Sequence, residues 1–167
     1  LDLARLDREG SLPVEARIPG DDPLWQDVGV VFRDSVDVRL RASTAGSGEV
    51  VVRGSVAAPT RHECRRCLEV GDDNWIGELT LVFVPSSMPD VDEEGEERVF
   101  NDSDAELDLA EPVREELILA IDPYVVCDPE CKGLCPHCGT NRNTDSCECT
   151  TDERDSRWDV LRALKQE

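Results

Sequence analysis

The chain has 167 residues, of which 39% are hydrophobic and 34% are charged, and its formal net charge at pH 7 is −20. This length predicts one moderate core with a solvated surface, and no run of eighteen apolar residues is available to cross a membrane. The strong negative charge disfavours direct, unassisted binding of RNA or DNA, because such binding relies on a basic surface that displaces counterions from phosphates. It favours a basic protein partner, or serves solubility alone.

The first ten residues, LDLARLDREG, are charged and lack the apolar stretch of a secretory signal. The sequence does not begin with Met, so we expect the natural start to lie upstream. Because the chain is rich in cysteine and has no export signal in view, we expect a reducing compartment and a cytoplasmic protein.

The segment that follows is typical of β-structure. Residues 35–42 alternate apolar and polar side chains, which predicts a strand with one buried face. A Gly-rich turn at 45–48 leads into residues 49–58, so these two segments should pair as an antiparallel hairpin. Residues 74–85 alternate again, and residues 11–18 are a weaker strand candidate. Together they predict an antiparallel sheet or small barrel.

Two helical segments are expected. Residues 22–25 can open a short helical turn. Residues 107–121 predict a longer helix, in which Asp108 caps the first turn and Glu111, three residues on, completes a capping box. The apolar stripe of this helix should pack on the sheet and consists of Val113, Leu117, Ala120 and Ile121.

Between the sheet and this helix, residues 85–104 are rich in Asp and Glu and poor in apolar side chains, which predicts an acidic loop. Such a loop can imitate phosphate towards a basic partner, although most acidic loops only keep a protein soluble. The expected fold class is therefore α+β. We expect residues 1–126 to form an antiparallel β domain with one helix, and residues 127–167 to form a zinc-binding tail with a terminal helix.

Eight cysteines are the strongest functional signal in the chain. Two pairs have Cys-x-x-Cys spacing, which is typical of zinc knuckles, and Gly139 supplies the permissive backbone after the second pair. Disulfides are the alternative, but a chain of this length does not need cross-links to build a core. Eight thiolates divide into two closed four-cysteine sites, so we expect two structural zinc ions. The expected ligands are Cys64, Cys67, Cys127, Cys131, Cys135, Cys138, Cys147 and Cys149.

The cysteine-rich segment and its surroundings resemble the YceD family, the large ribosomal RNA subunit accumulation proteins of bacteria and plastids. The resemblance implies a role in accumulation of large-subunit ribosomal RNA and in ribosome assembly, with a ribosomal protein or an assembly factor as partner. It implies no known reaction. Where similar proteins commonly have Leu, this chain has Arg142, which is not a ligand. The segments that carry the resemblance are Cys64–Leu68, residues 108–120, Cys127–Asn141, the pair Cys147 and Cys149, and a terminal helix at 157–165.

The eight cysteines can be divided in two ways. The favoured division joins the first pair to the start of the tail and leaves a local second site: Cys64, Cys67, Cys127 and Cys131 for one ion, and Cys135, Cys138, Cys147 and Cys149 for the other. The competing division places four consecutive cysteines of the tail on one ion: Cys127, Cys131, Cys135 and Cys138, with Cys64, Cys67, Cys147 and Cys149 on the second. It is disfavoured because a short segment would have to bend around one ion through three adjacent turns.

Enzymatic functions find little support in the sequence. A catalytic zinc site keeps an open position and usually includes His or a carboxylate, and the two histidines, His62 and His137, fit surface positions better than ligand positions. We therefore expect a non-enzymatic protein. Two alternatives stay open: a thiol redox sensor that uses Cys64 and Cys67 with the neighbouring arginines Arg65 and Arg66, or a zinc-ribbon RNA-binding module. Three arginines, Arg61, Arg65 and Arg66, crowd the first pair and could contact phosphate or a carboxylate of a partner, but we expect them to be solvated neighbours that partly neutralise the thiolates.

Overall fold

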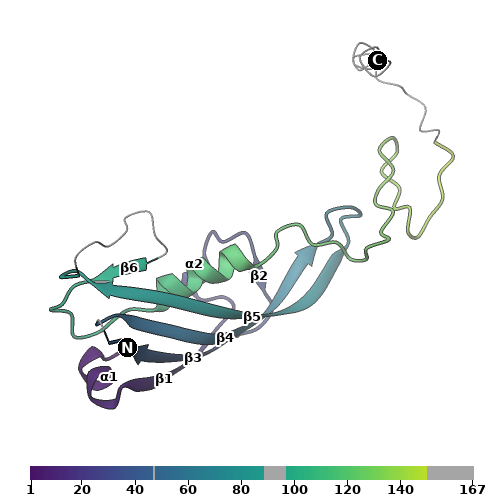
Figure 1. Cartoon of the computed structure of the whole chain (residues 1–167). Helices are drawn as coiled ribbons and strands as arrows, with labels where there is room; N and C mark the ends of the chain where they lie inside the picture. The colour runs from purple at the N-terminus through teal and green to yellow at the C-terminus, as the bar shows by residue number, and fades with distance from the viewer. Residues whose placement is uncertain (47, 89–96, 150–167) are drawn as a thin grey trace, which may run out of the picture.

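A computed structural model of the chain describes residues 1–46, 48–88 and 97–149. Within these residues the fold is α+β, with a mostly antiparallel open sheet of six strands and one long helix packed on it (Figure 1). The elements in chain order are α1 (Leu3–Glu9), β1 (Ser11–Ile18), the 3₁₀ turn η1 (Pro23–Trp25), β2 (Val31–Phe32), β3 (Val36–Thr44), β4 (Val50–Glu63), β5 (Val70–Pro85), β6 (Glu97–Phe100) and α2 (Ala110–Ala120).

The sheet has the order β1-β3-β4-β5-β6, and β2 pairs with β4. The longest ladder joins β4 and β5, from the pair Val50 and Phe83 to the pair Glu63 and Val70. The sheet stays open because β1 and β6 form its two edges, so the barrel alternative is wrong. The predicted strands are all present, and the predicted helical turn is η1, whose first residue follows the capping carboxylate of Asp22.

One strand lies where the sequence predicts only an acidic loop. β6 pairs in parallel with the end of β5, with Val84 opposite Val99. A parallel neighbour requires a crossover rather than a tight turn, and the intervening residues supply its length. The middle of the expected loop, residues 89–96, and the expected terminal helix at 157–165 lie outside the described residues.

The core lies between one face of the sheet and α2. Alternate side chains of β3, β4 and β5 are buried there, as the period-two pattern predicts, and Val113 and Leu117 of α2 pack against them. Ile121 is also buried, but Ala120 is exposed, so the predicted stripe is one residue too wide. Ala120 is the last residue of the helix, and the side chain that returns to the core is that of the next residue, Ile121.

Both helix starts depend on aspartate side chains. Asp108 accepts a hydrogen bond from the Ala110 amide at 2.9 Å, but the helix begins at Ala110 and no capping box forms. Glu111 instead contacts Arg114 at 3.4 Å. The sequence prediction misses α1, whose short and charged segment is held by Asp2 at its start. None of the helices in the described part of the chain is long and apolar enough to span a membrane.

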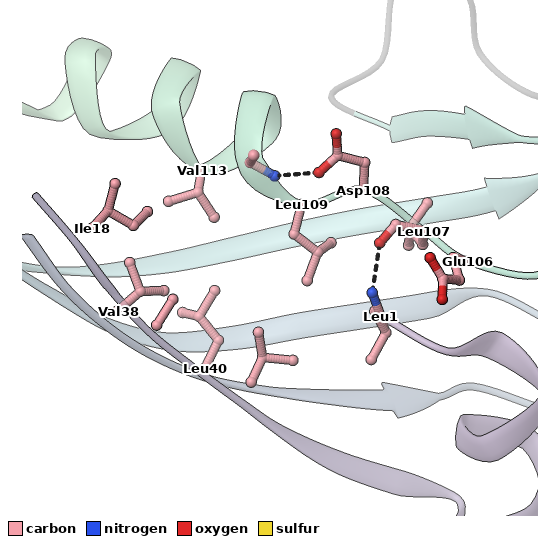
Figure 2. A pocket seen from close by; sticks show the side chains of 12 residues that line it. Leu1, Ile18, Val38, Leu40, Glu106, Leu107, Asp108, Leu109 and Val113 are labelled. Atoms are coloured by element: carbon pink, nitrogen blue, oxygen red, sulfur yellow. Dashed lines mark hydrogen bonds between the residues drawn. The ribbon is translucent and has the colours of Figure 1, made fainter. Parts of the chain in front are cut away.

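Figure 2 shows a depression where α2 begins and leaves part of the inner sheet face uncovered. Its volume is about 560 Å³, and its walls are mainly aliphatic side chains of β1, β3 and α2, such as Ile18, Leu40 and Val113. The carboxyl-bearing residues Glu106 and Asp108 line the side nearest the helix start. None of the eight cysteines lines this depression.

Candidate metal centres

The first Cys-x-x-Cys pair lies in the loop that joins the two longest strands, β4 and β5. The Cys64 amide donates to the carbonyl of Glu69 at 2.8 Å, and the Leu68 amide donates back to the carbonyl of Cys64 at 2.8 Å. These bonds form a tight turn that places Cys64 and Cys67 on the same side, both buried. Leu68 closes the turn with φ 61°, a left-handed conformation that a residue with a Cβ adopts at a cost.

The second pair repeats this turn with other residues. The Cys135 amide donates to the Thr140 carbonyl at 2.8 Å, and the Gly139 amide donates to the Cys135 carbonyl at 2.9 Å. Gly139 has φ 74° and stands where Leu68 stands in the first turn. The two turns, which we call the first and second knuckle (residues 64–69 and 135–140), therefore share one backbone geometry.

The first knuckle holds the beginning of the tail. Arg65 donates its amide to the Val125 carbonyl at 3.0 Å, and the Arg66 carbonyl accepts from the Leu134 amide at 2.9 Å. The Arg66 guanidinium also donates to the carbonyls of Pro129 and Cys131, at 3.0 and 3.1 Å. Arg66 is thus a clamp on the tail rather than only a solvated neighbour of the thiolates, which corrects the expectation from the sequence.

This docking brings four sulfur atoms together in a first cluster. The Sγ atoms of Cys64 and Cys131 lie 3.9 Å apart, and those of Cys67 and Cys127 lie 3.6 Å apart. All four sulfurs lie within 4.8 Å of one another. Three of the residues are buried and Cys127 is exposed.

A second cluster forms within the tail. Its four sulfur atoms also lie within 4.8 Å of one another, and its residues are Cys135, Cys138, Cys147 and Cys149. Only Cys135 is buried, so this cluster is more open to solvent than the first. The eight cysteines thus group in the favoured division and not in the competing one, because the first knuckle binds the segment after α2 and the second knuckle lies against Cys147 and Cys149.

The donor sets fit a tetrahedral thiophilic ion. Four thiolates at about 2.3 Å from one ion lie about 3.8 Å from each other in a tetrahedron, and the two closest pairs of the first cluster, 3.9 and 3.6 Å, match this spacing. None of the eight cysteines forms a disulfide. Each cluster can therefore hold a metal ion. His62 and His137 belong to neither cluster.

Hydrogen bonds already favour ionised thiols in both clusters. The Cys127 amide donates to the Cys64 sulfur at 3.3 Å and is the main cause that lowers the pKa of Cys64 to about 6. The Thr140 hydroxyl lies 3.2 Å from the Cys138 sulfur and is the main cause that lowers the pKa of Cys138 to about 6.

Each cluster also contains a thiol that keeps its proton. Contact with the Cys131 sulfur raises the pKa of Cys127 to about 12. Contact with the Cys138 sulfur raises the pKa of Cys149 to about 12. Four thiolates in one place repel each other, and a divalent cation removes this repulsion when it displaces the remaining protons.

Polar side chains around the first cluster were not found by sequence reasoning. Asn143 donates its side-chain amide to the Cys131 sulfur at 3.3 Å, while its side-chain oxygen accepts from the Lys132 amide at 2.8 Å. Asn141 donates to the Glu69 carboxylate at 3.2 Å and so links the tail to the first knuckle. Such contacts depend on docking of distant segments, and the only sequence signal was the Asn-rich run directly after the second knuckle.

Comparison with known proteins identifies relatives with the same segments. Residues 52–165 match the family model described as "Large ribosomal RNA subunit accumulation protein YceD". An uncharacterized protein of Mycobacterium tuberculosis is 34% identical over 143 residues, which cover 83% of this chain and 68% of the relative. The Arabidopsis thaliana protein named "Large ribosomal RNA subunit accumulation protein YCED homolog 1, chloroplastic" is 28% identical over 130 residues, 62% of this chain and 40% of the relative. No solved structure matches.

Proposed function

Because the chain belongs to the YceD family, we propose that it is a non-enzymatic factor for accumulation of large-subunit ribosomal RNA and for ribosome biogenesis. The observation that carries the proposal is the family match, which spans both cysteine clusters. The name of the Arabidopsis thaliana relative refers to the same process. We place the protein in the cytoplasm, where thiolate sites stay reduced.

We further propose that each cluster binds one zinc ion with a structural role. The support is the donor chemistry, since four sulfurs and no oxygen or nitrogen ligand form each cluster. A site with four protein ligands has no open position for a substrate, which supports a role without catalysis. When bound, zinc would offset two of the four thiolate charges in each cluster. Residues of the chain itself, those of the first knuckle with Arg66, hold the tail against the end of the sheet.

A redox use of the first pair has weaker support. Cys64 and Cys67 are 0% and 4% exposed, so an external thiol or disulfide would have little access to either sulfur. Both also lie within reach of two further cysteines in the same cluster. A thioredoxin-like pair sits at a helix start, whereas this pair lies between β4 and β5.

The proposed partner is a basic ribosomal protein or assembly factor. Its support is the net charge of −20, which favours a cationic surface on the other side of the contact. Association with such a partner should weaken as salt rises, because screening acts most strongly on exposed charges.

The function is tested by the ratio of large-subunit to small-subunit ribosomal RNA in the organism that carries this gene. Deletion of the gene should lower the ratio, and the wild-type gene should restore it. Cys64→Ser should restore it poorly, because loss of the first cluster releases the tail from the sheet. A matched control is Ser55→Ala, an exposed serine on β4, the strand that leads into the first knuckle. A normal ratio in the deletion strain would contradict the proposal.

A further inference from the structure

The face of the sheet that points away from α2 carries a pair of arginines with an unusual placement. Arg41 on β3 and Arg53 on β4 are directly opposite one another in the antiparallel register, and both are exposed. Side chains at opposed positions lie about 5 Å apart at their Cβ atoms, and like charges placed there destabilise a sheet. A carboxylate next to the pair would reduce this repulsion, and a chain with a net charge of −20 has many carboxylates.

No carboxylate relieves it among the residues that the structure describes. Arg17 on the same face contacts Asp37 at 3.8 Å, and Arg61 contacts Asp72 at 3.0 Å, but neither Arg41 nor Arg53 forms an ion pair within 4.0 Å. Arg41 has one side-chain hydrogen bond, to the hydroxyl of Ser11 at 3.3 Å. The pair is therefore a local positive site on an acidic protein.

Residues in register across neighbouring strands form a row, and the row that contains Arg41 and Arg53 has no acidic residue next to the pair. Pro13 lies beyond Arg41 on β1, and Thr80 lies beyond Arg53 on β5. The next row towards the β3–β4 turn consists of Ser11, Ser43, Val51 and Val82, and it ends in an acid, Glu97 on β6, two strands away from Val51. In the other direction, Glu15 and Glu78 stand one row away, in register with Arg39 and Ser55.

The two arginines also border a depression. Its volume is about 270 Å³, and its lining residues are Arg41, Ser43, Val51 and Arg53. Two guanidinium groups on opposite sides of a shallow hollow can each present paired N–H donors to one tetrahedral anion, which is the arrangement that suits phosphate. Bound phosphate would also neutralise the repulsion between the arginines.

We propose that the hollow between Arg41 and Arg53 binds a phosphate group of an RNA backbone. The choice of RNA rests on the proposed function, and it is supported by the surface itself. A protein interface is usually anchored by aromatic side chains as well as arginines, whereas the rows on either side of the pair carry no aromatic side chain. Backbone contact needs no such anchor, only correctly placed cations.

The negative charge of the rest of the protein limits how strongly the hollow can bind RNA. With a net charge of −20, the chain repels RNA at long range, so one phosphate contact gives weak affinity by itself. The hollow therefore positions RNA that a basic partner has brought close. This reconciles the acidic composition with a direct RNA contact at one place.

The test uses the full metal-loaded chain and a short fluorescein-labelled single-stranded RNA of mixed sequence, measured by anisotropy over a range of salt concentrations, because added salt screens the long-range repulsion. The double variant Arg41→Gln, Arg53→Gln should bind RNA about tenfold more weakly or worse, because charge-assisted hydrogen bonds are lost. Its salt dependence should fall in slope by about 0.7 for each phosphate contact removed. Arg17→Gln, on the same face but already paired with an acid, should bind as the wild type does.

A fold defect would not imitate this result. Removal of like charges that face each other should leave thermal stability equal or slightly higher, and inorganic phosphate should raise the melting temperature of the wild type more than that of the double variant. Equal RNA binding by all three proteins would overturn the proposal. Binding of labelled polyglutamate in place of RNA would also overturn it, since an acidic protein segment would then be the occupant.

The ribosomal RNA ratio separates this proposal from the proposed function. If the wild-type gene restores the ratio in the deletion strain and the double variant restores it equally well, the hollow is not an RNA contact but the proposed function stands. If deletion leaves the ratio unchanged, the proposed function fails, and the anisotropy measurement still decides whether the hollow binds RNA.

Discussion

The two knuckles share one backbone geometry but differ at the residue that closes the turn, and this difference predicts opposite effects of substitution. Leu68 has φ 61° and Gly139 has φ 74°. A residue with a Cβ pays about 1–2 kcal/mol for this left-handed conformation. Glycine avoids that strain but loses about 0.5–1 kcal/mol more conformational freedom on folding. Gly139→Ala should therefore destabilise the second knuckle by about 1 kcal/mol.

Space around these positions supports that estimate. A Cβ at position 139 would have no heavy atom within 4 Å, so its cost is conformational alone. Gly133 has φ 68°, and a Cβ there would meet the Arg66 carbonyl oxygen at 2.8 Å. Gly133→Ala should therefore cost more than Gly139→Ala. Leu68→Gly should be neutral to slightly stabilising, because the Leu68 side chain is 52% exposed and loses little packing.

Hydrogen exchange at single amides is the suitable assay, because it reports local opening of each turn. In Gly139→Ala, the amide of residue 139, which bonds the Cys135 carbonyl, should exchange roughly fivefold faster for about 1 kcal/mol. In Leu68→Gly, the amide of residue 68 should exchange no faster than in the wild type. The reasoning is refuted if Leu68→Gly loosens the first knuckle as much as Gly139→Ala loosens the second.

Two further predictions concern the clusters. Asn143→Ala removes the hydrogen bond to the Cys131 sulfur and should lower the metal affinity of the first cluster about tenfold or more, measured by competition with a chelator; unchanged affinity would contradict a role for Asn143. Chelation should remove amide protection from residues 127–149 but leave the β3–β4 ladder protected, and equal loss in both would contradict a local structural role of the metal.

The sheet could be predicted from sequence where one face is buried. β1 has the predicted bounds, Ser11–Ile18, whereas β3 starts one residue later and ends two residues later than predicted. Strand ends were less predictable: β4 and β5 extend towards each other as far as Glu63 and Val70, because the first knuckle closes their hairpin. Where both faces of a strand are solvated, apolar and polar side chains need not alternate, so the sequence pattern does not predict where the strand ends.

The elements that sequence reasoning missed depend on partners far away in the chain. β6 has only four residues and exists as a strand because it pairs with the exposed edge of β5. α1 has a single fully buried residue, Leu6, which is too weak a pattern to predict a helix. The grouping of the eight cysteines was predictable because ligand spacing constrains it. The supporting contacts of Arg66 and Asn143 were not, because they form only after the tail docks.

The central claim is that each four-cysteine cluster is a closed structural zinc site, and metal content per chain tests it most directly. Protein purified under reducing conditions should contain two zinc ions per chain and almost no thiol that reacts in the native state. Cys135→Ser should lose one ion and keep the circular dichroism of the sheet, since Cys135 belongs only to the second cluster. A wild-type content of one ion or none, or a content that Cys135→Ser does not change, would contradict the claim.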